Sequence, residues 1–279
     1  MKTLFRLLKP TSHHSSVLRI ALVLGVLTCS SQAQEDGEVQ VQVQKDEGAQ
    51  VFPIPEEVDK LLKNMSDHLI KAKTFAMEAD LLIDEVLDSG LLIQRAANLK
   101  LQAQRPNALR AIMTSDTEHR TIWYDGETVT IADVDDNVHV AVPVPDKIGP
   151  AMDHLMDRYG VSIALSDFFH ENPYEALTGS VERAYYIGMS QVNGVACHHL
   201  AFAQESVDWQ LWIEDGERPL PRKLVIVYKN DPGAPHYSAT LTAVKLQDPV
   251  PQDTFKAVIP DGSLRIDLLD ISPEASPQN

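Results

Sequence analysis

The feature that most constrains the fold is a series of strand-like segments separated by little more than turns, between Val192 and Leu246. Asn193-Gly194 and Asp215-Gly216 are dipeptides that favour type I′ turns, whose twist matches that of antiparallel strands. Val195–Gln204 and Val207–Glu214 lie between these two turns. A break at Pro219 and Pro221 follows, and Lys223–Tyr228 and His236–Leu246 complete the series. The pattern predicts an antiparallel meander, and a curved sheet of this kind needs other elements to fill its hollow.

The N-terminal half contains two longer strands in which apolar and polar residues alternate, joined by a turn at Asp88-Ser89-Gly90. Strands with one polar face are typical of a sheet that is wet on one side and covered on the other. Leu109–Thr114 follows, and Thr121–Pro143 repeats the strand–turn pattern around Asp125-Gly126. The apolar positions of the two long strands are Phe75, Met77, Ala79, Leu81 and Ile83, then Ala97, Leu99, Leu101 and Ala103.

Segments with helical periodicity supply the cover. One helix begins at Pro53-Ile54-Pro55, with carboxylates in its first turn, and another spans Asp146–Tyr159. Shorter helical pieces are expected at Leu165–Phe169 and Pro173–Leu177. The apolar faces comprise Val58, Leu61, Leu62, Met65 and Leu69 in the first helix and Ile148, Met152, Leu155, Met156 and Tyr159 in the second. We therefore predict an α+β fold: an open antiparallel half-barrel, formed by a curved meander sheet, with helices covering the concave face.

Residues 1–33 have the form of a signal peptide. A basic start without acidic residues precedes the short apolar run Ile20–Leu27, and Ser31-Gln32-Ala33 places small residues where signal peptidase cleaves. The run is too short for a stable membrane span, so we expect an exported, periplasmic protein that is not integral to the membrane. An alternative is lipidation of Cys29, since Val26–Cys29 approximates a lipobox; the chain would then be an outer-membrane lipoprotein.

Charge excludes nucleic acid as a partner. The chain has 24 basic and 40 acidic residues, a net charge of −16, and the signal peptide carries four of the basic ones. The mature chain therefore has 20 basic against 40 acidic residues, or −20. Binding to phosphate requires clustered lysine and arginine, which this balance opposes.

The remaining chain divides by composition. Residues 34–52 are rich in glutamine and acid and read as a flexible spacer, although Val39, Val41 and Val43 alternate with glutamine as in a strand. Residues 53–271 have the length and pattern of a single domain. Residues 272–279 contain two prolines and no apolar cluster, so we expect a disordered tail.

Several segments together resemble a known family. They are the first helix and strand pair, Arg105-Pro106, the Tyr124-Asp125-Gly126 hairpin, the methionine-bearing helix through Tyr159-Gly160, and the stretch Asp208–Leu224 with its two tryptophans. From about Glu56 to Pro260 the chain is similar to exported bacterial proteins of domain-of-unknown-function family 2092. That family resembles, more remotely, the LolA/LolB-like periplasmic lipoprotein carriers, whose open barrel holds helices and a lipid-binding cavity on its concave side. The resemblance implies a LolA-like half-barrel domain, and it implies fold better than function.

Cys197, His198 and His199 are the most evident candidates for a reactive site. Neighbours on a strand point to opposite faces, so the two histidines cannot bind one ion without a bulge. Cys197 and His199 share a face but stand beyond direct hydrogen-bond reach, which disfavours a nucleophile pair. The acidic clusters fall at turns, and no hydrolase, P-loop or Rossmann motif is present. We expect a protein that is not an enzyme, with no metal and no cofactor, and with Cys197 buried.

Two functions of different classes fit the predicted fold. The first is a non-enzymatic periplasmic carrier or receptor that holds an apolar ligand, such as a lipid or a lipoprotein acyl chain, between the sheet and the helices. The second is an envelope interaction or sensor module without a small ligand; an unrecognised hydrolase, which requires a cleft with converging polar groups, ranks third. A continuous apolar space on the order of several hundred Å³ distinguishes a carrier from a packed core.

Candidate ligand contacts follow from the predicted faces. Methionine repacks readily around irregular shapes, although ordinary core packing is the favoured interpretation of any single methionine. Trp212 lies among polar neighbours, where it could pack over the stem of Arg222 or Lys223 or contact a partner protein. The expected cavity wall consists of Leu81, Ile83, Leu99, Leu101 and Trp209 from the strands and Met152, Leu155 and Met156 from the helix.

Export should yield a mature protein that begins at Gln34, because Ser31 and Ala33 fit the peptidase pockets and Thr28 fits a lipobox poorly. Intact-mass analysis of the protein recovered from the periplasm measures this. A diacylated Cys29 at the N-terminus would contradict it.

Overall fold

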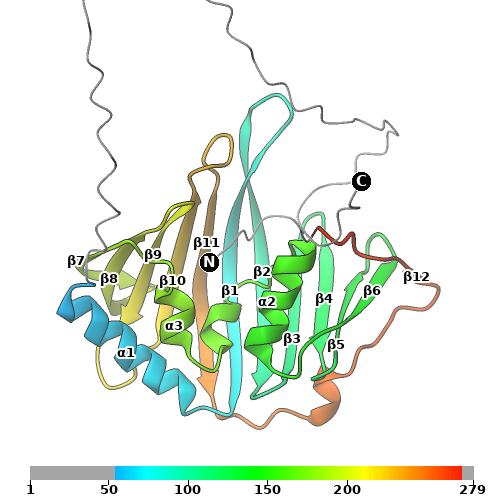
Figure 1. The fold of residues 1–279 in the computed structure, drawn as a ribbon, viewed down its shortest axis with the longest axis horizontal. Coiled ribbons are helices and arrows are strands. Elements are labelled where there is room, and N and C mark those ends of the chain that lie inside the picture. The colour runs from blue at the N-terminus through cyan, green and yellow to red at the C-terminus, as the bar shows by residue number, and fades with distance from the viewer. Residues whose placement is uncertain (1–53, 272–279) are drawn as a thin grey trace, which may run out of the picture. The chain divides into compact units, whose positions relative to one another are not determined.

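A twelve-stranded sheet dominates residues 54–271, the part of the chain that the computed structural model describes. The predicted signal peptide, spacer and tail (1–33, 34–52 and 272–279) lie outside the described residues. The strands follow the order β12-β6-β5-β4-β3-β2-β1-β11-β10-β9-β8-β7 across the sheet (Figure 1). Every neighbouring pair is antiparallel except β12 with β6. The predicted α+β open half-barrel is confirmed.

The path of the chain explains this order. The chain starts in the middle of the sheet with β1, runs outward to β6, crosses through helices to β7 at the other edge, and returns to β11 beside β1. The strands are β1 (Thr74–Val86), β2 (Leu92–Gln104), β3 (Ala108–Ser115), β4 (His119–Tyr124), β5 (Thr128–Asp133), β6 (Val138–Pro143), β7 (Arg183–Val192), β8 (Val195–Ala203), β9 (Val207–Glu214), β10 (Pro221–Tyr228), β11 (His236–Leu246) and β12 (Leu264–Arg265). Helices and the core therefore meet at the central strands.

The β1–β2 hairpin has the two faces that its alternating sequence predicts. The apolar residues of β1, including Leu81 and Ile83, are buried, as are Leu99 and Leu101 of β2. The opposite face carries cross-strand polar pairs such as Asn98 Nδ2 donating to Asp80 Oδ1 at 2.7 Å. A turn that ends at a glycine with positive φ connects the strands, and the hairpin extends past its neighbours (Figure 1).

Four helical elements lie on one face of the sheet: α1 (Glu56–Ile70), α2 (Ile148–Tyr159), the 3-10 helix η1 (Ser166–Phe169) and α3 (Pro173–Thr178) (Figure 1). α1 buries four of its five predicted apolar residues fully, and Leu61 is half-buried. α2 buries Ile148, Met152 and Leu155, but Met156 and Tyr159 remain partly exposed. At the end of α2, Gly160 adopts φ 65° and donates to the carbonyls of the last turn, which stops the helix.

The sequence pattern did not predict two of the strands, β7 and β12. β7 lies at the sheet edge, where Tyr185, Ile187 and Met189 are each at least half exposed and a register shift at Tyr186/Gly188 interrupts the pairing. β12 has only two residues and pairs with β6. A strand that buries few apolar residues, or one that is this short, leaves little periodicity to detect.

The face opposite the helices has a small apolar cluster of its own, formed by Val192, Cys197 and Trp212. His199 stacks on the Trp212 ring with centroids 4.0 Å apart, and Lys223 Nζ lies 5.1 Å from the same ring. Trp212 is therefore only 9 % exposed, and the predicted packing over a lysine stem is present. Cys197 is fully buried, as expected, and burial raises the pKa of its thiol.

Arg105 links the helical layer to the sheet. It lies in the β2–β3 turn, donates from Nη2 to Phe168 O at 3.3 Å and from Nη1 to His170 O, and places its guanidinium 5.0 Å from the centre of the Phe75 ring. Phe75 in turn contacts Phe169 edge to face, with ring centroids 5.3 Å apart. These contacts fix η1 and the segment after it over β1.

Replacing Arg105 with methionine should lower the free energy of unfolding by about 2–4 kcal/mol, because two partly buried carbonyls lose their charged donor. Arg105→Lys should lower the free energy of unfolding by less, because lysine keeps the charge. It should still lower it, because a lysine cannot reach both carbonyls. Urea denaturation measures the change, with Arg183→Met on the exposed edge strand as the matched control. A stability of Arg105→Met within 0.5 kcal/mol of the wild type, roughly the effect of an ordinary surface change, would contradict this role.

Candidate ligand-binding pocket

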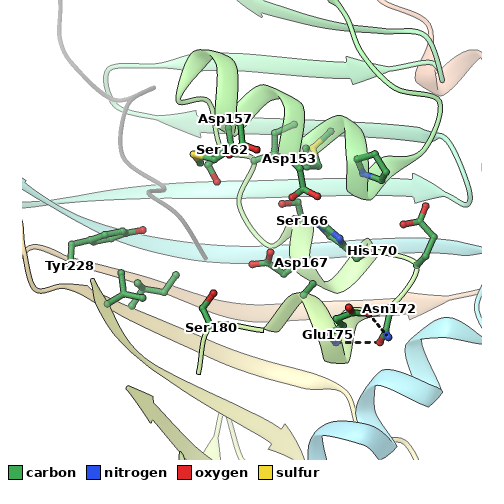
Figure 2. A pocket seen from close by; sticks show the side chains of 18 residues that line it. Asp153, Asp157, Ser162, Ser166, Asp167, His170, Asn172, Glu175, Ser180 and Tyr228 are labelled. Atoms are coloured by element: carbon green, nitrogen blue, oxygen red, sulfur yellow. Dashed lines mark hydrogen bonds between the residues drawn. The ribbon is translucent and has the colours of Figure 1, made fainter. Parts of the chain in front are cut away.

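A pocket of about 540 Å³ opens between α2, the η1–α3 segment and the ends of β9 and β10 (Figure 2). Its volume lies within the range of small-molecule sites. The lining residues are Pro150, Met152, Asp153, Met156, Asp157, Ser162, Ile163, Ser166, Asp167, His170, Glu171, Asn172, Glu175, Ala176, Ser180, Val207, Ile226 and Tyr228. The pocket therefore has apolar parts and a large polar part.

α2 supplies one wall through two pairs of residues at i and i+4, which lie one above the other on a helix. Met152 and Met156 form the apolar pair, and Asp153 and Asp157 form an exposed acidic pair beside it. The helix approaches the segment after η1 so closely that a Cβ on Gly149 would lie 2.7 Å from His170 Nδ1. A glycine at this position therefore permits the close packing that defines the wall.

The strand side of the pocket lies in a cross-strand row. Ile226, which lines the pocket, pairs with Trp209 on β9 and Tyr237 on β11, and Tyr237 pairs with Ile83 on β1. Trp209 and Tyr237 are 1 % and 2 % exposed. The Trp209 indole nitrogen and the Tyr237 hydroxyl have no hydrogen-bond partner in the described part of the chain, and burial raises the pKa of Tyr237.

The expected wall residues fall into two groups. Met152 and Met156 line the pocket. The other six are buried around it: Leu155 beneath α2, and Leu81, Ile83, Leu99, Leu101 and Trp209 on the covered face of the sheet. Trp209 pairs directly with Ile226 and so adjoins the pocket without lining it, whereas Ile83 is separated from Ile226 by Tyr237.

Sequence reasoning missed the polar lining contributed by the segment from Ser162 to Ser180. Asn172 caps α3 by accepting from the Glu175 backbone nitrogen at 3.2 Å, and its side-chain amide donates to the Glu175 carboxylate at 3.1 Å. The signal that could have found this segment is its density of serine, aspartate, histidine and glutamate between two short helices. The apolar stripe of the neighbouring helix is the more regular pattern, and it alone led to the predicted wall.

Asp167 is the least solvated carboxylate of the lining. Its side chain lies at the centre of the pocket, between α2 and α3 (Figure 2). Burial raises the pKa of this carboxyl, His170 opposes that shift, and the nearby Asp153 adds to it. A carboxylate held in this environment costs the folded state free energy at neutral pH.

The Cys197–His199 segment forms no reactive site. His198 contacts Tyr186 Oη and Asp215 Oδ1, each at 3.1 Å, while His199 contacts Gln210 Oε1 at 2.9 Å from the other face. Among residues 54–271, no three His, Cys, Asp or Glu side chains are placed to hold a metal ion. No helix in that range is long and apolar enough to cross a membrane.

With this geometry established, comparison with known proteins identifies the family. Residues 58–269 match the family described as "Predicted periplasmic protein (DUF2092)". The chain belongs to this family. The match covers the sheet and the pocket, and it agrees with the expected periplasmic location. Comparison with curated protein sequences finds no match.

Several solved structures align with this chain at low sequence identity. An uncharacterised conserved protein from Thermus thermophilus aligns over 76 % of this chain and 99 % of its own, with 10 % identity and a TM-score of 0.45. The Mycobacterium tuberculosis lipoprotein LppX aligns over 70 % and 97 %, with 13 % identity and a TM-score of 0.43. A LolA superfamily protein from Nitrosomonas europaea aligns over 71 % and 96 %, with 8 % identity and a TM-score of 0.33.

Asp167→Asn should make the protein more stable at neutral pH. Because folding raises the pKa of this carboxyl, the protein loses stability as pH rises above the pKa that the group has in the unfolded chain. The neutral amide has the same shape and removes this loss. The difference in stability between variant and wild type should shrink as pH falls below 3.8, the ordinary pKa of this carboxyl, because the group then becomes protonated in both the folded and the unfolded state. Thermal denaturation at several pH values measures it, with exposed Asp88→Asn as control. A variant less stable than wild type at neutral pH would contradict the burial of this charge.

Proposed function

We propose that this protein is a non-enzymatic periplasmic carrier or receptor that holds an apolar or amphiphilic molecule between its curved sheet and its helical layer. The observation that carries the proposal is the pocket of about 540 Å³ between α2, the η1–α3 segment and β9–β10. Its volume meets the scale expected of a carrier, and Met152, Met156 and Ile226 give part of its lining the required apolar character.

Two buried donors next to the pocket support the proposal. The Trp209 indole N–H and the Tyr237 hydroxyl flank Ile226, and neither has an acceptor among the described residues. Leaving such a group unsatisfied costs about 1–3 kcal/mol, so native proteins retain few of them without a reason. A ligand or a water molecule that enters past Ile226 would satisfy them.

Movement of α2 gives the ligand a route into the core. The helix is joined to the β2–β3 turn by the hydrogen bond from Ile148 N to Pro106 O and to the C-terminal segment through Arg158. No hydrogen bond between strands has to break when its middle shifts. Met152 and Met156 adapt their shape at low cost because thioether side chains are unbranched. Leu99, Leu101 and Leu155 would then become wall residues as the space enlarges beneath the helix.

The alternative function, an envelope interaction module, is favoured by a different surface. β7 ends the sheet, and its outer edge has no partner strand within residues 54–271. Tyr185, Ile187 and Met189 are exposed along it. Exposed edge strands accept an added strand from a partner, so this edge is where a protein partner would bind.

A hydrolase receives less support. The pocket contains serine, histidine and aspartate side chains, and Asp167 and His170 lie in the same turn of chain. Yet no hydrogen bond joins His170 to Ser162 or Ser166 in the described part of the chain, and a nucleophile requires a positioned base. The arrangement of polar groups in this pocket therefore supports binding better than it supports hydrolysis.

Met152→Ala and Met156→Ala should preserve the fold and change the uptake of an apolar fluorescent probe. Each truncation enlarges the pocket, so probe affinity should shift by about fifteen- to sixtyfold, the range expected for the loss of two or three buried methylene-sized groups. Met189→Ala on the exposed edge strand is the matched control and should bind as the wild type does. Met156→Asp, which places a carboxylate against the apolar wall, should reduce uptake further.

Fluorescence titration of the folded proteins measures these affinities. Failure of the wild type to take up any apolar probe would overturn the carrier proposal and leave the interaction module as the better account. Equal effects of the pocket and control substitutions would show that the probe binds elsewhere.

A further inference from the structure

The charge of the pocket lining is one-sided. Five carboxylates line it, and no lysine or arginine is among the lining residues. Asp153 and Asp157 come from α2, Asp167 from η1 and Glu175 from α3, and Glu171 belongs to the segment between η1 and α3 that packs against α2. The carboxylates therefore come from separate elements that converge on one space (Figure 2).

Few cations offset these carboxylates: Arg105 interacts electrostatically with Glu171, and His170 lies close enough to Asp167 to oppose the rise in its pKa. None of the five forms an ion pair with a lysine or arginine of residues 54–271. Glu175 accepts a hydrogen bond from Asn172, but Asp167 accepts none from any described group. Asp167 is partly buried and still faces the open space of the pocket, so its carboxylate is free to accept a hydrogen bond from a donor group that enters there.

The acidic groups adjoin an apolar surface. On α2, Asp153 directly follows Met152 and Asp157 directly follows Met156. An acidic stripe and an apolar stripe therefore run side by side along the same wall. Across the pocket lie Val207 and Ile226. A molecule that fills this space has to present an apolar body to the methionine side and a polar group to the aspartates.

The sign of that polar group follows from electrostatics. In a partly desolvated cavity, an anionic head would add a like charge beside existing carboxylates, and a cationic head would add an opposite one. Repulsion of the wrong charge contributes to specificity as much as attraction of the right one. Fatty acids and other anionic amphiphiles are therefore poor ligands for this pocket.

We propose that the pocket selects an amphiphile whose head group is a cationic amine, and that Asp153, Asp157 and Asp167 form the subsite for that amine. The proposal deepens the carrier function and rests on it. It assigns the apolar wall to the chain of the ligand and the aspartates to its head.

Three probes with the same ten-carbon chain separate head-group charge from apolar binding: decylamine, decanol and decanoate. Each is titrated against the folded mature protein carrying the neutral dye N-phenylnaphthylamine, and displacement of the dye gives the affinity. Decylamine should bind at least tenfold more tightly than decanoate, a difference of about 1.4 kcal/mol, with decanol between them. The ratio should fall as salt is raised, because part of the subsite is exposed.

The matched variants are Asp153→Asn/Asp157→Asn and Asp167→Asn, against Asp88→Asn at the tip of the β1–β2 hairpin. Both pocket variants should lose most of the preference for decylamine while decanol binds unchanged. Asp88→Asn should retain the full preference, which excludes a general effect of the acidic surface. Butylamine, which has the same head group and a short chain, should displace no dye.

The outcomes separate this inference from the function beneath it. If decanoate binds as tightly as decylamine, or if the pocket variants keep the preference, the amine subsite is wrong and the carrier function stands. If neither the dye nor any of the three probes binds, both proposals fail together.

Discussion

The contacts of the β2–β3 turn with the helical layer hold the arrangement on which the pocket depends. Arg105 donates to the carbonyls of Phe168 and His170, and the backbone carbonyl of Pro106 accepts from Ile148 N at 3.0 Å, at the start of α2. One short turn therefore fixes both helical walls of the pocket. A partly buried guanidinium suits this task because it reaches two carbonyls at once and adds the face of Phe75 to its contacts.

Much of the fold could be predicted because its signals are local. The alternation in β1 and β2 and the Asn-Gly and Asp-Gly turns specify the meander, and the apolar faces of α1 and α2 specify what covers it. The edge strand β7 could not be found in this way, since Tyr185 and Ile187 are exposed and do not belong to an alternating buried face. β7 forms because it pairs with β8, and this pairing depends on the folded arrangement of the sheet rather than on the local sequence pattern.

The pocket was only partly predictable for the same reason. Met152 and Met156 belong to a helical stripe and could be read from spacing, whereas Asp167 and His170 belong to a segment whose position is set by Arg105, more than sixty residues away in sequence. The contact of Arg105 with this segment leaves no periodic pattern in the sequence that could predict it. The structure also gives a stability cost to the features that make the space usable: a carboxylate with a raised pKa and two buried donors without acceptors. Proteins commonly retain such groups at binding sites, where a ligand compensates for them.

The most direct test of ligand binding at this place uses the native methionines as reporters. Methyl NMR of the methionine-labelled protein during titration with decanol follows Met152 and Met156 on the pocket wall, Met77 in the packed core and Met189 on the exposed edge. The account predicts that the Met152 and Met156 methyl signals shift and saturate at one ligand per chain, while the Met189 signal stays in place. Saturable shifts confined to Met189, or no shift at Met152 and Met156, would contradict it.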